Sequence, residues 1–308
     1  MDGGQVTGMI RAGAQTRGIV TVCLAMALFA ANDATIKILA ERLGPAQVML
    51  LRGCVGGAIL LALGLVLGIG RQLWMALRPA VLLRALCDAM ASVMFVMALV
   101  GMPVATITAL IQLVPILTSV AGVLMFGDVM TRRQSLALAI GLLGVVMITR
   151  PSAEGVGMHF LFGIAAIVLL TTRDVITRGS AQRVPSLVVA TCATLAIPVI
   201  SIPQLSGETW HAVDLESAVL IGMLGGLVAA GNLLMIVAVR SAPLPAIAPY
   251  RYSAIPFALI AGAVLLGESP DALMLAGTGA IALGGVLALP RAVAAPAAEK
   301  TEAGQESS

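Results

Sequence analysis

The stretch Pro103–Asp128, PVATITALIQLVPILTSVAGVLMFGD, contains no charged residue before its last position. At a helical rise of about 1.5 Å per residue, it is long enough to cross a hydrocarbon layer of about 30 Å. Similar apolar segments follow one another along almost all of the 308-residue chain, which is 59% hydrophobic and 11% charged. Short charged or Pro/Gly-marked breaks separate them. The sequence therefore predicts an all-α integral membrane protein.

Ten membrane-spanning helices are predicted, because ten apolar segments are long enough to cross the bilayer. Their limits are residues 18–39, 46–69, 80–100, 103–126, 134–150, 157–176, 186–203, 217–239, 243–266 and 272–289. With a cytoplasmic N-terminus, ten arginines flank the spans on the cytoplasmic side, against Lys37, Arg42 and Arg150 on the other side. Because positive charge marks cytoplasmic loops, we expect both termini in the cytoplasm and the protein in the inner membrane of a bacterial-type cell.

A faint internal repeat divides the ten spans into two sets of five. At an offset of about 141 residues, Asp33 aligns with Asp174 and Pro115 with Pro256. Because five is odd, the second copy must enter the membrane from the opposite side, so the repeats are inverted. Such repeats are common in secondary transporters, although a purely structural bundle could carry the same duplication. The expected organisation is a flexible N-terminus, two five-helix repeats and a disordered cytoplasmic tail, over residues 1–16, 17–150, 156–290 and 291–308.

Charged residues inside the predicted spans are costly in lipid and therefore informative. Three pairs of opposite charge are spaced four residues apart: Asp33 with Lys37, Arg84 with Asp88, and Asp174 with Arg178. This spacing places both members on one helical face, where they can neutralise each other. One interpretation is structural, because long side chains near span ends reach the interface. The other is functional: the aspartate releases its helical partner and binds substrate or a proton.

Three arginines within the spans have no partner at this spacing: Arg52, Arg173 and Arg251. Arg251 is the hardest to explain, since it lies in APYRYSAIP (Ala248–Pro256), about 12 Å from the cytoplasmic end by the helical rise. The prolines around it each remove a backbone donor, so this helix must face protein or a watery cavity. Tyr250 and Tyr252 flank the cation with hydroxyls and aromatic faces. Arg251 is interpreted either as a substrate-binding residue or as the structural partner of a buried aspartate such as Asp88.

Several function classes lack their characteristic residues. The chain has two lysines, Lys37 and Lys300, and neither follows a Gly-rich loop that could cradle phosphate. The spans contain no catalytic triad, HExxH motif or paired metal carboxylates, so we expect neither enzyme activity nor a metal site. The net charge of +3 follows from the loop arginines and does not indicate nucleic-acid binding. A channel would require rings of like charge, which scattered single charges do not suggest.

The opening stretch has a counterpart in the second half, PLPAIAPYRYSAIPFALIAGAVLLGESPD (Pro243–Asp271), and a short Gly-rich span follows each of the two. The pair resembles the signature of the EamA-type transporters in the drug/metabolite transporter superfamily, with Asp128 and Glu268 as the acids after the signature glycines. The resemblance covers residues 18–290. It implies two EamA-type five-helix repeats, forming a secondary transporter that works by alternating access.

A second resemblance narrows the substrate class. ANDATIKILAERLGPAQVMLLRG (Ala31–Gly53), together with APYRYS, is similar to the branch that contains S-adenosylmethionine uptake carriers and, less closely, riboflavin carriers. It implies uptake of a small organic metabolite without covalent chemistry or a cofactor. The alternatives are an amino-acid or metabolite exporter of the same superfamily and a non-transporting membrane scaffold. The other expected partners are the lipid bilayer, protons as a candidate coupling ion, and a second copy in a candidate homodimer.

The candidate substrate-binding residues come from the resemblance and from the polar groups inside the spans. The resemblance implies Asn32, Asp33, Arg52, Tyr250, Arg251 and Tyr252, and the spans add Arg84, Asp88, Gln112, Asp174 and Ser253. Arg52 lies about six residues from the outer face, where snorkelling would also explain it. In the expected mechanism, Arg251 and the tyrosines hold an anionic, partly aromatic metabolite. Asp33 or Asp88 then supplies the counter-charge or a proton site.

Overall fold

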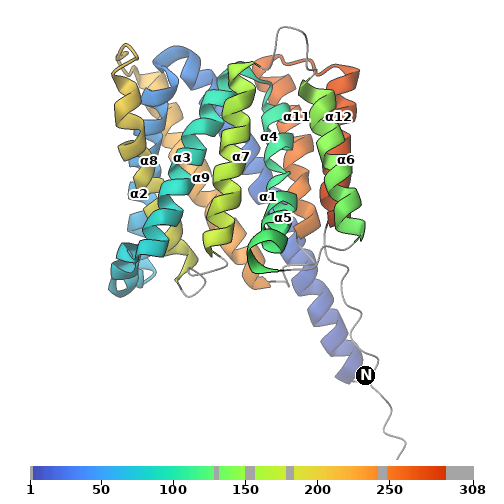
Figure 1. Ribbon diagram of the computed structural model, residues 1–308. Coiled ribbons are helices and arrows are strands. Elements are labelled where there is room, and N and C mark those ends of the chain that lie inside the picture. Colours follow the sequence, from blue (N-terminus) through green and yellow to red (C-terminus); the bar gives the residue numbers. More distant parts are fainter. Residues whose placement is uncertain (1–2, 128–131, 150–156, 178–183, 242–247, 289–308) are drawn as a thin grey trace, which may run out of the picture.

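The protein is a bundle of helices that run roughly along one axis (Figure 1). The computed structural model describes residues 3–127, 132–149, 157–177, 184–241 and 248–288, and within these ranges it contains no strand. Among the described residues, seven helices are long and apolar enough to cross a membrane. Three shorter apolar helices accompany them: Ser135–Ile148, Tyr250–Leu266 and Ala272–Leu287. These findings confirm a helical protein with membrane spans, whereas the arrangement of ten spans in two repeats stays a prediction.

The helices follow one another with short connections. In chain order they are α1 (Gly3–Leu43), α2 (Pro45–Val66), η1 (Ile69–Leu77), α3 (Pro79–Gly101), α4 (Val104–Ile111), α5 (Val114–Phe126), α6 (Arg132–Thr149), α7 (Met158–Ile176), α8 (Ser186–Leu205), α9 (Leu215–Ser241), η3 (Ala248–Ser253), α11 (Ala254–Leu266) and α12 (Ala272–Ala288). The first part of α1 projects from the bundle (Figure 1). We call the end at which α1 enters the bundle the proximal end, and the opposite end the distal end.

The fourth predicted span is broken in its middle, between α4 and α5. Pro115, in the first turn of α5, has no N–H to donate to the carbonyl of Ile111, and its ring crowds that carbonyl. Gln112 and Leu113 instead donate to carbonyls three residues earlier, with N···O distances of 3.0 Å. The segment is therefore two helices in line, where the sequence predicted one.

The ninth predicted span is also broken, where the 3₁₀ helix η3 passes into α11 at Ser253. Pro256 lies in the first turn of α11, and its missing N–H prevents an ordinary α-helical bond across this junction. The predicted start of the span, at Pro243, lies outside the described residues. The two broken segments are the ones that the repeat aligns through Pro115 and Pro256.

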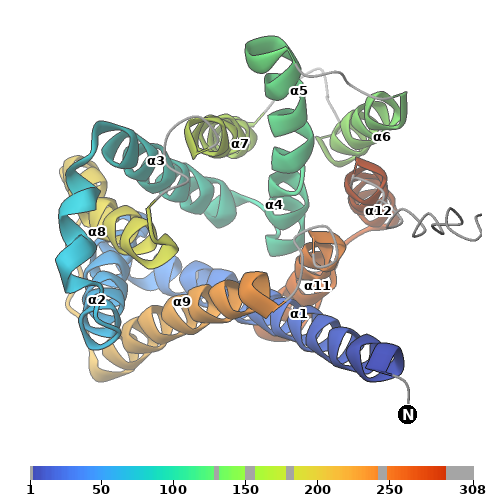
Figure 2. The same ribbon diagram turned by 90° about the horizontal axis from the view of Figure 1, so that it is seen from below.

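Helices far apart in the sequence pack side by side. The most extensive pairings are α6 with α12, α3 with α7, α1 with α9, and α2 with α8, and Figure 2 shows them along the bundle axis. Glycines permit the closest of these contacts: a Cβ on Gly144 would lie 2.6 Å from the carbonyl oxygen of Gly277, and one on Gly284 would lie 2.7 Å from that of Ala137. The backbones of α6 and α12 therefore touch directly, as small residues allow in membrane helices.

The distal half of the bundle is densely packed where α1, α3 and α4 meet. Ile36, Leu99, Ile107 and Leu110 are fully buried there in one hydrophobic cluster. Each of them lies within seven residues of a distal helix end. This packing leaves the space for a functional site nearer the middle and the proximal end.

Candidate functional site

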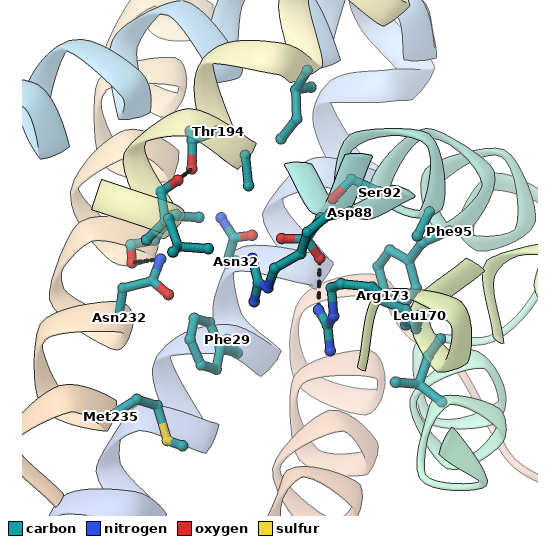
Figure 3. A pocket seen from close by; sticks show the side chains of 18 of the residues that line it. Phe29, Asn32, Asp88, Ser92, Phe95, Leu170, Arg173, Thr194, Asn232 and Met235 are labelled. Atoms are coloured by element: carbon teal, nitrogen blue, oxygen red, sulfur yellow. Dashed lines mark hydrogen bonds and ion pairs between the residues drawn. The ribbon is translucent and has the colours of Figure 1, made fainter. Parts of the chain in front are cut away.

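A cavity of about 640 Å³ lies among α1, α2, α3, α7, α8 and α9. Sites for small molecules usually have volumes of ~300–1,000 Å³. In the close view, Phe29 and Asn232 lie on one side, and Phe95 and Leu170 lie on the other (Figure 3). The wall therefore draws side chains from both halves of the sequence.

Five of the eleven candidate binding residues line this cavity: Asn32, Asp33, Arg52, Arg84 and Asp88. Six lie outside its wall: Gln112, Asp174, Tyr250, Arg251, Tyr252 and Ser253. The wall also contains polar residues that were not selected from the sequence: Ser92, Arg173, Thr177, Thr194 and Asn232. Of these, Arg173 had a visible signal, because it is a charge within a predicted span.

Arg173 forms the strongest polar contacts in the cavity wall. Its Nη1 donates to Oδ1 of Asp88 at 2.6 Å, and its Nη2 and Nε lie 2.8 and 2.9 Å from Oδ1 of Asp174. The expected pairing of Asp88 with Arg84 is therefore wrong, and Arg84 Nε instead donates to Oγ1 of Thr177 at 2.8 Å. The expected partner of Asp174, Arg178, lies outside the described residues. Arg173 thus joins α7 to α3, and two carboxylates neutralise its positive charge.

Asp33 is placed differently from the other acids in the wall. Its expected partner, Lys37, instead bonds Oε1 of Glu268 at 2.7 Å. Within the described ranges, Asp33 forms no hydrogen bond or ion pair, and the charge that acts on it is Arg52. Among the residues that the structure describes, the one hydrogen bond of Arg52 goes from Nη1 to Sδ of Met49, at 3.6 Å. Both charged groups therefore remain available to a ligand.

The charges in the wall favour a ligand with two signs of charge. Three arginines and two aspartates line the cavity. Arg173 is neutralised, whereas Arg52 and Arg84 have no carboxylate within 4 Å in the described part of the chain. An anionic group can bind these two guanidinium groups, and a cationic group can bind Asp33. The attraction between opposite charges is stronger in a partly buried site than in water, because the dielectric constant is lower there. Such a ligand would therefore bind tightly.

Aromatic residues complete the cavity. Phe29 and Phe95 both line it, although aromatic residues make up only 3% of the chain. The Phe29 ring lies on α9 where Gly231 leaves room, since a Cβ at Gly231 would lie 2.6 Å from its Cε1. Neither phenylalanine was selected from the sequence, because an apolar residue in an apolar span carries no signal of its own. They offer flat faces on which a planar group can stack.

The APYRYS segment connects the two helix breaks. The side-chain amide of Gln112 donates to the carbonyl of Arg251 at 3.2 Å, and the hydroxyl of Tyr252 donates to the carbonyl of Gln112 at 3.5 Å. Each break thus supplies partners for the backbone of the other, which lipid could not do. The Arg251 side chain is exposed, and the alternative ion pair with Asp88 is not formed, because Asp88 binds Arg173. A substrate-binding role for these residues stays a prediction.

The distal end is closed by polar contacts between segments far apart in the sequence. Lys37 Nζ donates to Glu268 Oε1 and to the carbonyl of Met102, both at 2.7 Å. Glu268 also accepts from the backbone N–H of Val104, at 3.0 Å to Oε2. The Lys37 and Glu268 side chains are only 13% and 15% exposed. One partly buried cluster therefore ties α1, the start of α4 and the α11–α12 connection together.

A second set of distal contacts joins the α1–α2 connection to the α8–α9 connection. Glu208 accepts from the backbone N–H of Ala46 at 3.1 Å. Gln47 donates to the carbonyl of His211 at 2.8 Å and accepts from its N–H at 2.9 Å. Gln47 is almost completely buried. Polar contacts thus also join distal connections that belong to different halves of the chain.

The chain is similar to known transporters. The EamA-like transporter family matches residues 16–150. An S-adenosylmethionine uptake transporter of Rickettsia bellii is 24% identical over 258 residues, which are 82% of this chain and 87% of that protein. An S-adenosylmethionine uptake transporter of Rickettsia conorii is 23% identical over 258 residues, which are 82% of this chain and 86% of that protein. An uncharacterised transporter of Helicobacter pylori is 31% identical over 173 residues, 54% of this chain and 57% of that protein.

A solved structure extends the likeness of fold beyond the matched domain. A solved structure described as "Crystal structure of protein" aligns with this chain at a TM-score of 0.60 and 20% sequence identity. The alignment covers 90% of this chain and 97% of the chain in that structure. The whole bundle, including α7 to α12, therefore has a known fold. Residues 16–150 thus match the EamA-like transporter family, and the likeness of fold extends over most of the chain.

Proposed function

We propose that this protein is a secondary transporter that binds a small zwitterionic metabolite in the cavity and moves it by alternating access. The likeness of residues 16–150 to a transporter family supports a transport role. The observation that carries the proposal is the charge in the cavity wall: Asp33 has no partner among the described residues, and Arg52 and Arg84 have no carboxylate there. Charges inside a membrane are retained where they serve substrates.

The pattern of helix packing supports two inverted halves around this cavity. An offset of about 141 residues makes α7 the counterpart of α1 and α9 the counterpart of α3. Exchanging each helix for its counterpart turns the α1·α9 pairing into α7·α3, and both pairings are extensive. The pairings of α2 with α8 and of α6 with α12 each join two counterparts. This is the pattern expected of a two-fold axis in the membrane plane, with the substrate held between the halves.

S-adenosylmethionine is the substrate that fits the wall best among those considered. Its amino-acid part carries an ammonium group and a carboxylate, its sulfonium is cationic, and its adenine is planar. We assign the carboxylate to Arg52 and Arg84, a cationic group to Asp33, and the adenine to Phe29. The names of the two Rickettsia relatives agree with this assignment. Riboflavin has no charged group that would require Asp33 or Arg52, so the riboflavin-like alternative is weaker.

Uptake into proteoliposomes tests the proposal directly. We expect saturable accumulation of labelled S-adenosylmethionine, competition by S-adenosylhomocysteine, and no competition by riboflavin. The exporter alternative is tested with vesicles that are preloaded with labelled methionine or another amino acid. If the protein is an amino-acid exporter, these vesicles should lose their label. If no labelled compound moves and none shifts the thermal stability of the purified protein, a membrane scaffold is the better description.

We further propose that the distal end faces outward, because the arginine-rich loops are expected in the cytoplasm. The distal contacts then close the cavity to the outside. Replacing Lys37 with methionine should populate the outward-open state about tenfold more, because the closed state loses a partly buried charged bond of ~1.4 kcal/mol. The measurement is the rate at which a membrane-impermeant maleimide labels Ser92→Cys from outside, with the four native cysteines replaced by alanine.

Two controls separate this effect from a general loosening. Lys37→Arg keeps the charge and should label as slowly as the parent protein. Arg42→Gln removes an exposed distal ion pair, that of Arg42 with Glu216 at 2.7 Å, and should also leave the rate unchanged. Equal labelling of the Lys37→Met and parent proteins would show that the Lys37–Glu268 bond does not hold the distal end closed.

A further inference from the structure

The 3₁₀ helix η1, Ile69–Leu77, has two different faces. In a 3₁₀ helix, residues three apart lie above one another. Arg71, Trp74 and Leu77 form one such row, and all three are exposed, Trp74 to 58% and Leu77 to 74%. The opposite side of η1 is attached to the bundle. The row therefore points away from the protein.

The attachment of η1 fixes this orientation. Ile69, Met75 and Ala76 pack against a buried cluster formed by the start of α3 and by α8 and the residue shortly before it. Ile69 also lies against α2, where a Cβ on Gly64 would be 2.8 Å from its Cδ1. The row of Arg71, Trp74 and Leu77 is thus presented by a fixed support and not by a loose loop.

The row continues into the apolar surface of the neighbouring helices. Leu65 and Val66 at the end of α2 are exposed, as are Leu82 and Leu83 at the start of α3. In a membrane-spanning protein, such leucine-rich outer surfaces face lipid tails. Trp74 lies on η1, which connects the end of α2 to the start of α3, and tryptophan is enriched in membrane proteins where the lipid tails meet the headgroups.

Basic side chains accompany this edge. The guanidinium carbon of Arg78 lies 5.1 Å from the centre of the Trp74 ring, in a cation–π contact. Arg71 belongs to the exposed row itself. An amphipathic segment with tryptophan and leucine on one side and arginines beside them suits the boundary between lipid tails and negatively charged headgroups. We propose that η1, through Arg71, Trp74, Leu77 and Arg78, is an interfacial anchor that binds anionic lipid headgroups.

The two tryptophans of the chain, Trp74 and Trp210, allow a sharp test. Trp210→Phe leaves Trp74 as the single reporter in the full-length protein. The protein is reconstituted in vesicles of equal parts phosphatidylcholine and phosphatidylglycerol, with bromine atoms placed near the headgroup or near the chain end. We expect Trp74 fluorescence to be quenched more by the shallow bromines. Absence of quenching, or stronger quenching by the deep bromines, would overturn the interfacial position.

The preference for anionic lipid is tested by placing the shallow bromines on one lipid at a time. We expect brominated phosphatidylglycerol to quench Trp74 about twofold or more over brominated phosphatidylcholine, because each basic residue attracts anionic lipid. Arg71→Gln with Arg78→Gln should equalise the two lipids while quenching persists. Arg132→Gln with Arg133→Gln, at the proximal end of α6, should leave the difference intact. Equal quenching by both lipids in the parent protein would overturn the lipid preference.

Discussion

Replacing Asp33 with asparagine should reduce substrate uptake by about 100-fold while the protein still folds. The expected loss is that of a charge-assisted bond to the cationic group of the substrate, worth ~1.5–3 kcal/mol. Folding should be spared because Asp33 has no hydrogen bond or ion pair within the described ranges, and asparagine has the same shape. Initial uptake rates over a range of substrate concentrations, with a thermal melt of the purified protein in detergent, provide the measurement.

The controls for Asp33 lie on the same helix and in the same transport assay. Glu41→Gln removes an exposed carboxylate two turns further along α1 and should leave uptake unchanged. If Asp33 also carries a coupling proton, uptake by Asp33→Asn should no longer respond to a pH gradient. The exchange of labelled for unlabelled substrate, which needs no gradient, should then decrease less than gradient-driven uptake. Normal uptake by Asp33→Asn would remove Asp33 from the proposed site.

The sequence predicted which charged residues line the cavity better than it predicted their partners. Hydropathy and the cost of buried charge identified Asp33, Arg52, Arg84 and Asp88, and all four line the cavity. The i, i+4 rule, however, considers one helix only. Asp88 binds Arg173 from α7, a partner 85 residues away, because α3 and α7 pack side by side. Which faces two helices turn toward each other is a tertiary property, so this pairing could not be found from spacing.

The proline-rich stretch illustrates the same limit in the backbone. Pro256 indicated a missing backbone donor within the ninth predicted span, whereas the break at Pro115 was not predicted, although the missing N–H is visible in the sequence at both positions. What satisfies the irregular backbone was not visible: the partners of Gln112 are Arg251 and Tyr252, in the other half of the chain. Tyr252 occupies space that a side chain on Gly285 would fill. The sequence leaves open whether this segment binds substrate or has a structural role; in the structure it lies outside the cavity wall and contacts the other break.

Replacing Arg173 with methionine should destabilise the folded protein by about 2–4 kcal/mol, because it leaves Asp88 and Asp174 without their shared cation. The expected value lies below that of a fully buried pair, since the Arg173, Asp88 and Asp174 side chains are 22%, 25% and 35% exposed and water partly compensates. Methionine keeps the apolar length of the side chain, so packing changes little. The midpoint of thermal unfolding in detergent, compared with the parent protein, measures the effect.

A second substitution distinguishes lost charge balance from lost packing. Adding Asp88→Asn to Arg173→Met removes one of the two unpaired charges and should restore about half of the lost stability, since the penalty comes from the uncompensated carboxylates. Arg42→Gln, which breaks the exposed pair with Glu216, should shift stability by less than about 1 kcal/mol. If Arg173→Met melts like the parent protein, Arg173 is not the bridge that holds α3 to α7. If Asp88→Asn restores nothing, the loss arises from packing, and Arg173 acts as an apolar spacer whose charge is incidental to the fold.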